Sequence, residues 1–179
     1  MRDMVWRDVI EHRTVWVGAS LVAAATAMFT TICLNAIIGG VTADPQVFTA
    51  PLGRSALLQT STNLLALSGG PAIVVLMTVL GTLVPQMREL HASWRLAGAS
   101  PGQVLRLFCQ QVVLTAAVGA LVGGLASLPL QGAANAFLGR GMAPGLTQPP
   151  GFWSVASILG SVLIVASWGA IAALYPAWR

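Results

Sequence analysis

Residues 86–108 read QMRELHASWRLAGASPGQVLRLF, and this stretch decides how the rest of the sequence is divided. It is the most charged interior piece of a chain in which 8% of residues are charged, and it lies between long apolar runs. Each uncharged run exceeds the roughly 20 residues that cross the hydrocarbon core of a bilayer as a helix. The runs are Thr14–Ala43, Ser55–Met87, Leu107–Gly139 and Gly141–Trp178.

The composition places this chain in a membrane. It has 179 residues, of which 56% are hydrophobic, and a mean hydropathy of +0.79. Soluble domains are about half apolar and a quarter charged. The net charge of +4 comes from nine basic residues, all Arg and without a run, so it indicates membrane topology rather than nucleic-acid binding. We predict an all-α integral membrane fold with four transmembrane helices in a single domain.

The predicted elements follow from the apolar runs and the residues that interrupt them. Residues 1–13 carry apolar side chains at helical spacing opposite Arg and Asp, which predicts a helix lying in the headgroup layer, with a frayed tail as the alternative. Proline interrupts helical hydrogen bonding, so Pro129 and Pro176 are expected to end the third and fourth membrane helices. The expected elements are transmembrane helices at 15–38, 63–85, 104–128 and 153–175, outer loops at 39–62 and 129–152, and a cytoplasmic coupling segment at 86–103.

Arginine is distributed unequally between the two ends of these helices. Seven of the nine Arg residues lie in the N-terminal segment, in 86–108 or at the C-terminus, whereas Arg54 and Arg140 lie in the predicted outer loops. Loops rich in Lys and Arg stay on the cytoplasmic side of a membrane. We therefore predict a multi-pass protein of the cell membrane with both termini and the coupling segment in the cytoplasm.

Several single residues within the membrane helices carry expectations. Gly119 and Gly123 form a small-xxx-small arrangement, which allows close helix contact. Asn35 either bonds across helices or faces the membrane interface, and the interface is favoured. Cys33 and Cys109 are expected in opposite halves of the bilayer, too far apart for a disulfide, which needs Cα atoms within about 7 Å.

The sequence offers no site for catalysis. No predicted membrane helix carries a charged residue in its interior, which is the usual sign of an intramembrane site. His12 and His91 stand apart from any Cys or carboxylate cluster with metal spacing. No phosphate-binding GxxxxGK[ST] loop occurs, and the chain has no Lys. We expect no enzyme activity, no metal and no directly bound cofactor, so any ATP and Mg²⁺ would be bound by a partner subunit.

The coupling segment has its own internal pattern. Leu90, Trp94 and Ala97 recur at helical spacing, so one side of a short helix can face a partner or the membrane. Gly98 predicts a helix stop. Ser100 followed by Pro101 predicts the cap and first residue of a new helix. The pattern indicates helix, tight turn and helix, and the alternative is an ordinary cytoplasmic loop.

Two motifs resemble the FtsX-like permeases, the family of MacB and LolE. One follows the second membrane helix, and its matching positions are Arg88, Glu89, Arg95, Leu96, Ala97, Gly98, Ala99, Gln103 and Val104. The other ends the fourth helix, and its matching positions are Ala173, Leu174, Tyr175, Pro176, Ala177 and Arg179. The connection between the first two helices is too short for the large extracytoplasmic domain usual in the family, so the resemblance is to a reduced form.

The resemblance implies the membrane subunit of an ATP-binding cassette (ABC) transporter of the mechanotransmission type. Such a subunit pairs with a second permease chain, the same or related, and with a dimer of cytoplasmic ATPase subunits that bind ATP and Mg²⁺. The coupling segment would dock into the ATPase. The residues expected to couple to it are Arg88, Glu89, Leu90, Trp94, Arg95, Leu96, Gly98, Ala99 and Ser100.

The nature of the client follows from the small outer loops and the uncharged helices. These favour a hydrophobic or amphipathic substrate, such as an antimicrobial peptide, a lipid or a drug, extracted from the membrane. One alternative is an ATPase-driven signalling protein that activates an extracytoplasmic partner, such as a cell-wall hydrolase, without transport. Another is a passive membrane assembly factor that has no ATPase.

Overall fold

Four long helices make up the described part of the protein. The computed structural model describes residues 13–42, 53–86, 100–141 and 154–178. The helices are α2 (Arg13–Thr42), α3 (Gly53–Gln86), α5 (Pro101–Gly141) and α6 (Val155–Trp178). All four are long and apolar enough to cross a membrane, and the described ranges contain no strand. The predicted all-α membrane architecture is confirmed.

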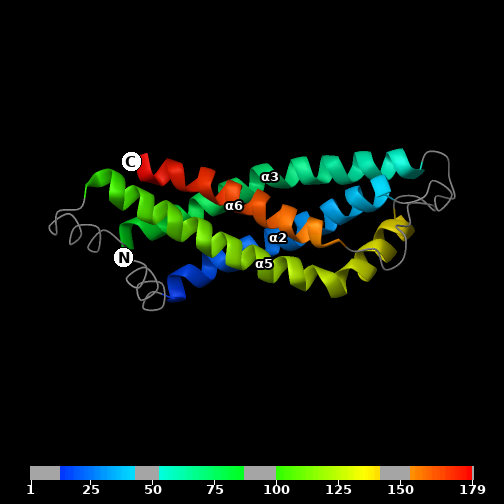
Figure 1. The fold of residues 1–179 in the computed structure, drawn as a ribbon, viewed down its shortest axis with the longest axis horizontal. Coiled ribbons are helices and arrows are strands. Elements are labelled where there is room, and N and C mark those ends of the chain that lie inside the picture. The colour runs from blue at the N-terminus through cyan, green and yellow to red at the C-terminus, as the bar shows by residue number, and fades with distance from the viewer. Residues whose placement is uncertain (1–12, 43–52, 87–99, 142–153, 179) are drawn as a thin grey trace.

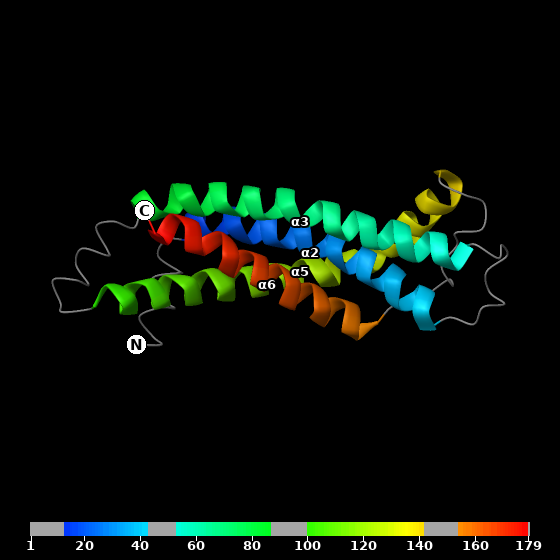
Figure 2. The same ribbon diagram turned by 90° about the horizontal axis from the view of Figure 1, so that it is seen from above.

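The four helices lie along one another in an elongated bundle (Figure 1). At one end α2 and α5 begin and α3 and α6 end, and we call this the elbow end because residues 87–99 join α3 to α5 there. We call the opposite end the loop end. α2 and α6 each contact all three other helices, whereas α3 and α5 scarcely touch. Figure 2 shows the start of α5 on the side of the bundle opposite α3.

Glycines bring the backbones of α2 and α5 into direct contact. A Cβ atom on Gly119 would lie 2.6 Å from the carbonyl oxygen of Ser20, and one on Gly123 would collide with the backbone of Ala24. Hydrocarbon supplies no hydrophobic force between helices, so close packing of small residues is what holds membrane helices together. We call this contact the glycine seam, and α2 packs more extensively against α5 than against any other helix.

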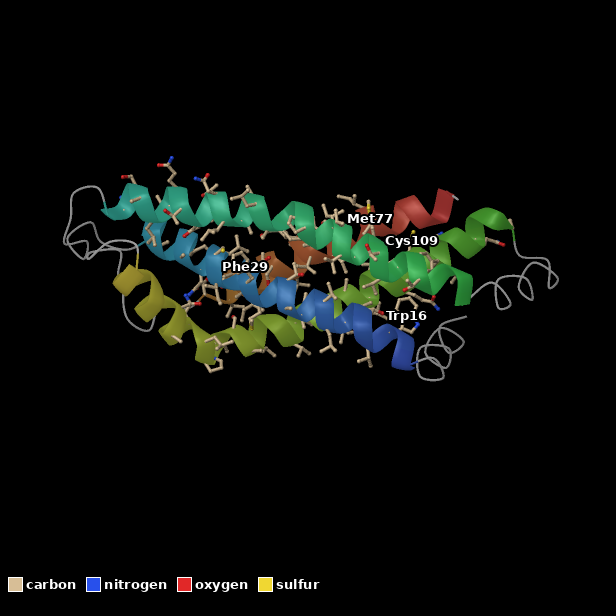
Figure 3. All side chains as sticks on the ribbon, turned by 180° about the vertical axis from the view of Figure 1, so that it is seen from behind. Trp16, Phe29, Met77 and Cys109 are labelled. Atoms are coloured by element: carbon tan, nitrogen blue, oxygen red, sulfur yellow. The ribbon has the colours of Figure 1, made fainter. Side chains whose placement is uncertain are left out.

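Apolar side chains fill the space between the helices towards the elbow end. One buried cluster comprises Trp16, Leu76, Leu80, Phe108, Val112, Ala172 and Ala173. Figure 3 shows Trp16 in this region, together with Met77 and Cys109. The Trp168 ring of α6 lies against α3, where a Cβ atom on Gly69 would be 3.0 Å from it. Cys33 is buried, Cys109 is half-buried, and both are free thiols.

The outer surface of the bundle is suited to lipid. Leu67 is 72% exposed, Leu163 is 70% exposed and Leu21 is 65% exposed. On α5 the exposed positions form a stripe of Leu and Val residues, including Leu114, Leu121 and Leu125. A water-soluble monomer rarely exposes contiguous apolar surface of this extent, but a bilayer solvates it at no cost.

All four helices extend beyond the expected positions. α2 runs from Arg13 to Thr42 rather than from 15 to 38, so the first four residues of the predicted outer loop are helical. α3 begins at Gly53 rather than near residue 63, because residues 53–62 contain no strong helix breaker and Leu57 is buried in the bundle. α5 continues through Pro129 to Gly141. Between Pro129 and Gly139 the segment holds three Ala and two Leu residues, which favour helix. α6 continues two residues past Pro176, a difference within the usual uncertainty of helix ends.

Pro129 bends α5 instead of ending it. Proline lacks the N–H that would bond to the carbonyl four residues earlier, so a helix that continues through it usually kinks. Figure 1 shows α5 changing direction where its colour passes from yellow-green to yellow, the part that holds Pro129. Burial stops just before this point, since Ser127 is buried whereas Leu128 and Leu130 are exposed.

Some predicted elements lie outside the described residues. They are the interfacial helix at 1–13 apart from Arg13, most of the coupling segment, the central part of the first outer loop, and the last part of the second. These remain predictions.

The glycine seam generates a stability prediction. Gly123→Ala should destabilise the bundle, because the added methyl collides with the α2 backbone and such overpacking typically costs about 1–3 kcal/mol. Gly132→Ala in the same helix is the matched control, since no atom lies within 4 Å of the new methyl. It should be neutral, or stabilising by up to about 1 kcal/mol. Thermal unfolding in one detergent measures both variants, and equal melting temperatures would contradict the seam.

Candidate functional site

The start of α5 carries a two-way helix cap beside the coupling segment. The backbone N–H of Gln103 lies 3.4 Å from the Ser100 hydroxyl and 3.0 Å from the Ser100 carbonyl. In return the Ser100 N–H donates to the Gln103 side-chain oxygen at 2.9 Å. This is a capping box, in which two backbone donors at a helix start are satisfied reciprocally. Together with Pro101 as first helical residue, it fixes where the coupling segment ends.

The other proposed coupling residues lie outside the described residues. They are Arg88, Glu89, Leu90, Trp94, Arg95, Leu96, Gly98 and Ala99. The segment that contains them joins the end of α3 to the capped start of α5, so both of its ends are attached to described helices.

A groove lies between α2 and α3 about halfway along the bundle. Its volume is about 520 Å³. It is lined by Val22, Ala25, Thr26 and Phe29 of α2 and by Ser68, Pro71, Ala72 and Val75 of α3. Figure 3 shows Phe29 on the part of α2 that lies beside α3. The groove opens on the surface that faces the bilayer, because Phe29 is 39% exposed and Val75 is 45% exposed.

The hydroxyl groups in this groove form hydrogen bonds within their own helices. The Thr26 hydroxyl donates to the Val22 carbonyl at 2.8 Å, and the Ser68 hydroxyl donates to the Leu65 carbonyl at 2.9 Å. No lining residue is charged. The groove therefore offers apolar walls with a few hydrogen-bond acceptors, which suits an acyl chain or an apolar side chain.

Asn35 joins α2 to the start of α6 at the loop end. Its side-chain oxygen accepts the backbone N–H of Ser154 at 3.0 Å and lies 3.4 Å from the Ser157 hydroxyl. Ser154 in turn caps α6, accepting the N–H of Ala156 at 3.2 Å. Asn35 is only 2% exposed. The expectation that it faces the membrane interface is wrong, because the free N–H groups at the start of α6 require an acceptor.

A second polar contact joins the same two helices nearer the middle of the bundle. The hydroxyl oxygens of Thr31 and Ser161 are 2.8 Å apart, and both residues are buried. Each hydroxyl also lies within hydrogen-bond distance of a carbonyl in its own helix, of Ala27 and Ile158 respectively. Since each hydroxyl has one proton, one of them donates across the interface. The contact fixes the register of α2 against α6.

Arg54 joins α3 to the end of α2. Its Nε donates to the Gly40 carbonyl at 2.8 Å and its Nη2 donates to the Val41 carbonyl at 3.0 Å. The last carbonyls of a helix have no partner within it and carry partial negative charge, so a cation there is stabilising. A Cβ atom on Gly40 would be 3.0 Å from Leu58, so the two helices meet closely at this point.

The described ranges hold no Asp, Glu or His, and no group of residues in them has the composition of a metal site.

Sequence reasoning missed the groove and the Arg54 contact, and it gave the cross-helix bond of Asn35 only as the disfavoured alternative. Arg54 had been counted only as a charge of an outer loop. Its position just before an apolar run, with Gly39 and Gly40 following the predicted first helix, was a signal for a cation that caps that helix. The groove had no sequence signal, because its residues are ordinary in any membrane helix.

Comparison with known proteins gives one finding. The family model of the FtsX-like permease C-terminal region matches residues 64–179, which covers α5, α6 and most of α3. No curated protein and no solved structure matches the chain.

Proposed function

Because this chain belongs to the FtsX-like permease family and is the membrane subunit type of an ABC transporter, we propose that it converts ATP hydrolysis by a separate subunit into movement of its membrane helices. The observation that carries the proposal is which two helices the coupling segment connects. It joins α3 to α5, and these two helices scarcely touch. A force on the segment therefore acts on two helices that do not brace one another.

The partner is a dimer of cytoplasmic ATPase subunits, each of which receives the coupling segment of one permease chain. Leu90 and Trp94 are the buried anchors, since aromatic and large apolar side chains dominate interface energies. Arg88, Glu89 and Arg95 set the register by charge pairs at the rim, each worth about 1 kcal/mol or less. ATP and Mg²⁺ belong to the ATPase, and a second permease chain completes the complex.

The remaining coupling residues shape the turn before α5. In this proposal Gly98 and Ala99 belong to the tight turn that the sequence predicts before α5, and Leu96 precedes that turn. Ser100 then starts α5 through its capping box with Gln103. The cap supports the proposal because a movement of the turn is passed directly to α5, without a slack linker between them.

The client is a hydrophobic or amphipathic molecule taken from the membrane, such as a peptide, a lipid or a drug. The support is the α2–α3 groove, which is uncharged, about 520 Å³ in volume and open towards lipid. Protection against antimicrobial peptides is a biological role that fits such a client. The unequal distribution of Arg supports the proposed orientation, with the elbow end and both termini in the cytoplasm.

Removal of the aromatic anchor tests the coupling. Trp94→Ala should weaken binding of the ATPase by roughly 30-fold, which corresponds to the loss of about 2 kcal/mol at an interface anchor. Trp178→Ala is the matched control, a tryptophan predicted on the same side of the membrane but outside the coupling segment. Co-purification of the ATPase from membranes that hold equal amounts of each variant measures the effect. Equal recovery with Trp94→Ala would count against this role.

Blocking the groove tests the client. Ala25→Trp should fill the groove from its exposed rim, so that protection against membrane-active peptides or hydrophobic drugs falls to that of a deletion strain while the ATPase still co-purifies. Ala126→Trp is the control, because Ala126 is also exposed but lies on α5 away from the groove. Full protection by Ala25→Trp would contradict the groove as the client site. A deletion strain indifferent to every compound would instead favour the signalling alternative.

A further inference from the structure

α3 is the membrane helix least covered by the rest of the chain. Of its most apolar window 22% is buried, compared with 39% for α2, 39% for α5 and 33% for α6. It scarcely contacts α5, and halfway along its length the groove separates it from α2. α3 therefore has fewer contacts to lose on moving than any other helix of the bundle.

The contacts that hold α3 differ between its two ends. At the loop end, Arg54 donates two hydrogen bonds to carbonyls of α2, at 2.8 and 3.0 Å. At the elbow end, Leu76 and Leu80 are buried in an apolar cluster with Trp16 of α2 and with residues of α5 and α6. Hydrogen bonds are directional and weaken steeply when misaligned, whereas apolar contact is non-directional and tolerates sliding. The loop end of α3 is thus held by directional bonds, whereas its elbow end is held by apolar packing.

α2 and α5 are in direct backbone contact. Their backbones touch at the glycine seam, where even one added methyl group on Gly123 would collide with α2. Well-packed interiors transmit displacement rather than absorb it. The coupling segment thus connects the α2–α5 pair to α3, the membrane helix with the smallest buried share.

We propose that Arg54 is a hinge about which α3 swings relative to the α2–α5 pair, so that the groove is a gate that widens from its elbow-end side. The proposal rests on the proposed function for its source of movement, since the ATPase acts at the elbow end. The size of the expected movement follows from helix geometry. Between Arg54 and Thr82 the helix is roughly 40 Å long, so a swing of about 10° displaces Thr82 by roughly 7 Å.

Spin-label distances at both ends of α3 test the hinge. In a background with Cys33→Ala and Cys109→Ala, Val17→Cys with Thr82→Cys reports the elbow end, and Thr42→Cys with Gln59→Cys reports the loop end. All four labelled positions are exposed. In the complex with the ATPase, the elbow-end distance should change by roughly 7 Å between the nucleotide-free and ATP-trapped states, while the loop-end distance stays constant. Equal changes at both ends, or a change at the loop end alone, would overturn the proposal.

The isolated chain in lipid nanodiscs separates the hinge from the ATPase. There the elbow-end pair should give a broader distance distribution than the loop-end pair, and Arg54→Leu should broaden the loop-end distribution. Arg106→Leu, which changes an exposed arginine of α5, is the matched control and should leave the loop-end distribution unchanged. An unchanged loop-end width in Arg54→Leu, or equal widths at both ends of the parent, would overturn the hinge even if the ATPase binds.

A label pair across α2 and α5 shows that the Arg54→Leu variant has folded. Val17→Cys with Gln110→Cys should give the same distance in the parent and in Arg54→Leu, because the glycine seam does not involve α3. Failure of the ATPase to co-purify would remove the proposed function but leave the isolated-chain result to decide the hinge.

Discussion

The contact between the backbones of α2 and α5 at Gly119 and Gly123 is what the rest of the bundle depends on. In lipid, apolar side chains gain little from leaving their solvent, so helices associate where small residues allow close approach. Once α2 is paired with α5, α6 packs against both and reaches α3 through Trp168. α3 is left at the edge, with its loop end fastened and its middle bordered by a groove.

At the loop end, hydrogen bonds from polar side chains join the helices, whereas the glycine seam joins them by close backbone contact. Helix ends expose backbone groups that have no partner within their own helix. Here Asn35 of α2 accepts a hydrogen bond from the start of α6. Arg54 of α3 donates two hydrogen bonds to the last carbonyls of α2. These bonds satisfy groups that would be costly to leave unpaired close to hydrocarbon. They also tie α3 and α6 to α2 at this end of the bundle.

Much of this architecture was predictable from sequence because the bilayer is a strict constraint. Four uncharged runs of sufficient length gave four helices, and Ser100 with Pro101 gave the start of α5. The helix ends were harder to predict. Pro129 bends α5 because neighbouring residues favour helix, and α3 starts early because Leu57 packs inside the bundle. Asn35 and Arg54 depend on which helix ends meet in space, which single-helix patterns do not encode.

α5 packs closely against α2, whereas α3 is the least buried membrane helix, and the coupling segment joins these two helices. A permease that transmits work needs a place to receive it, a part that stays rigid and a part that moves. The coupling segment, the α2–α5 pair and α3 are our candidates for these three roles.

Photo-cross-linking can show whether the coupling segment docks on an ABC ATPase. A photoreactive amino acid in place of Leu90, in membranes that contain the whole complex, should form a covalent adduct with an ABC ATPase subunit, identified by its Walker motif peptides. The same amino acid in place of Gln59, at the loop end of α3, should form none. An adduct from position 90 alone is the predicted result. Absence of an ATPase adduct at position 90, or equal adducts from both positions, would contradict the account.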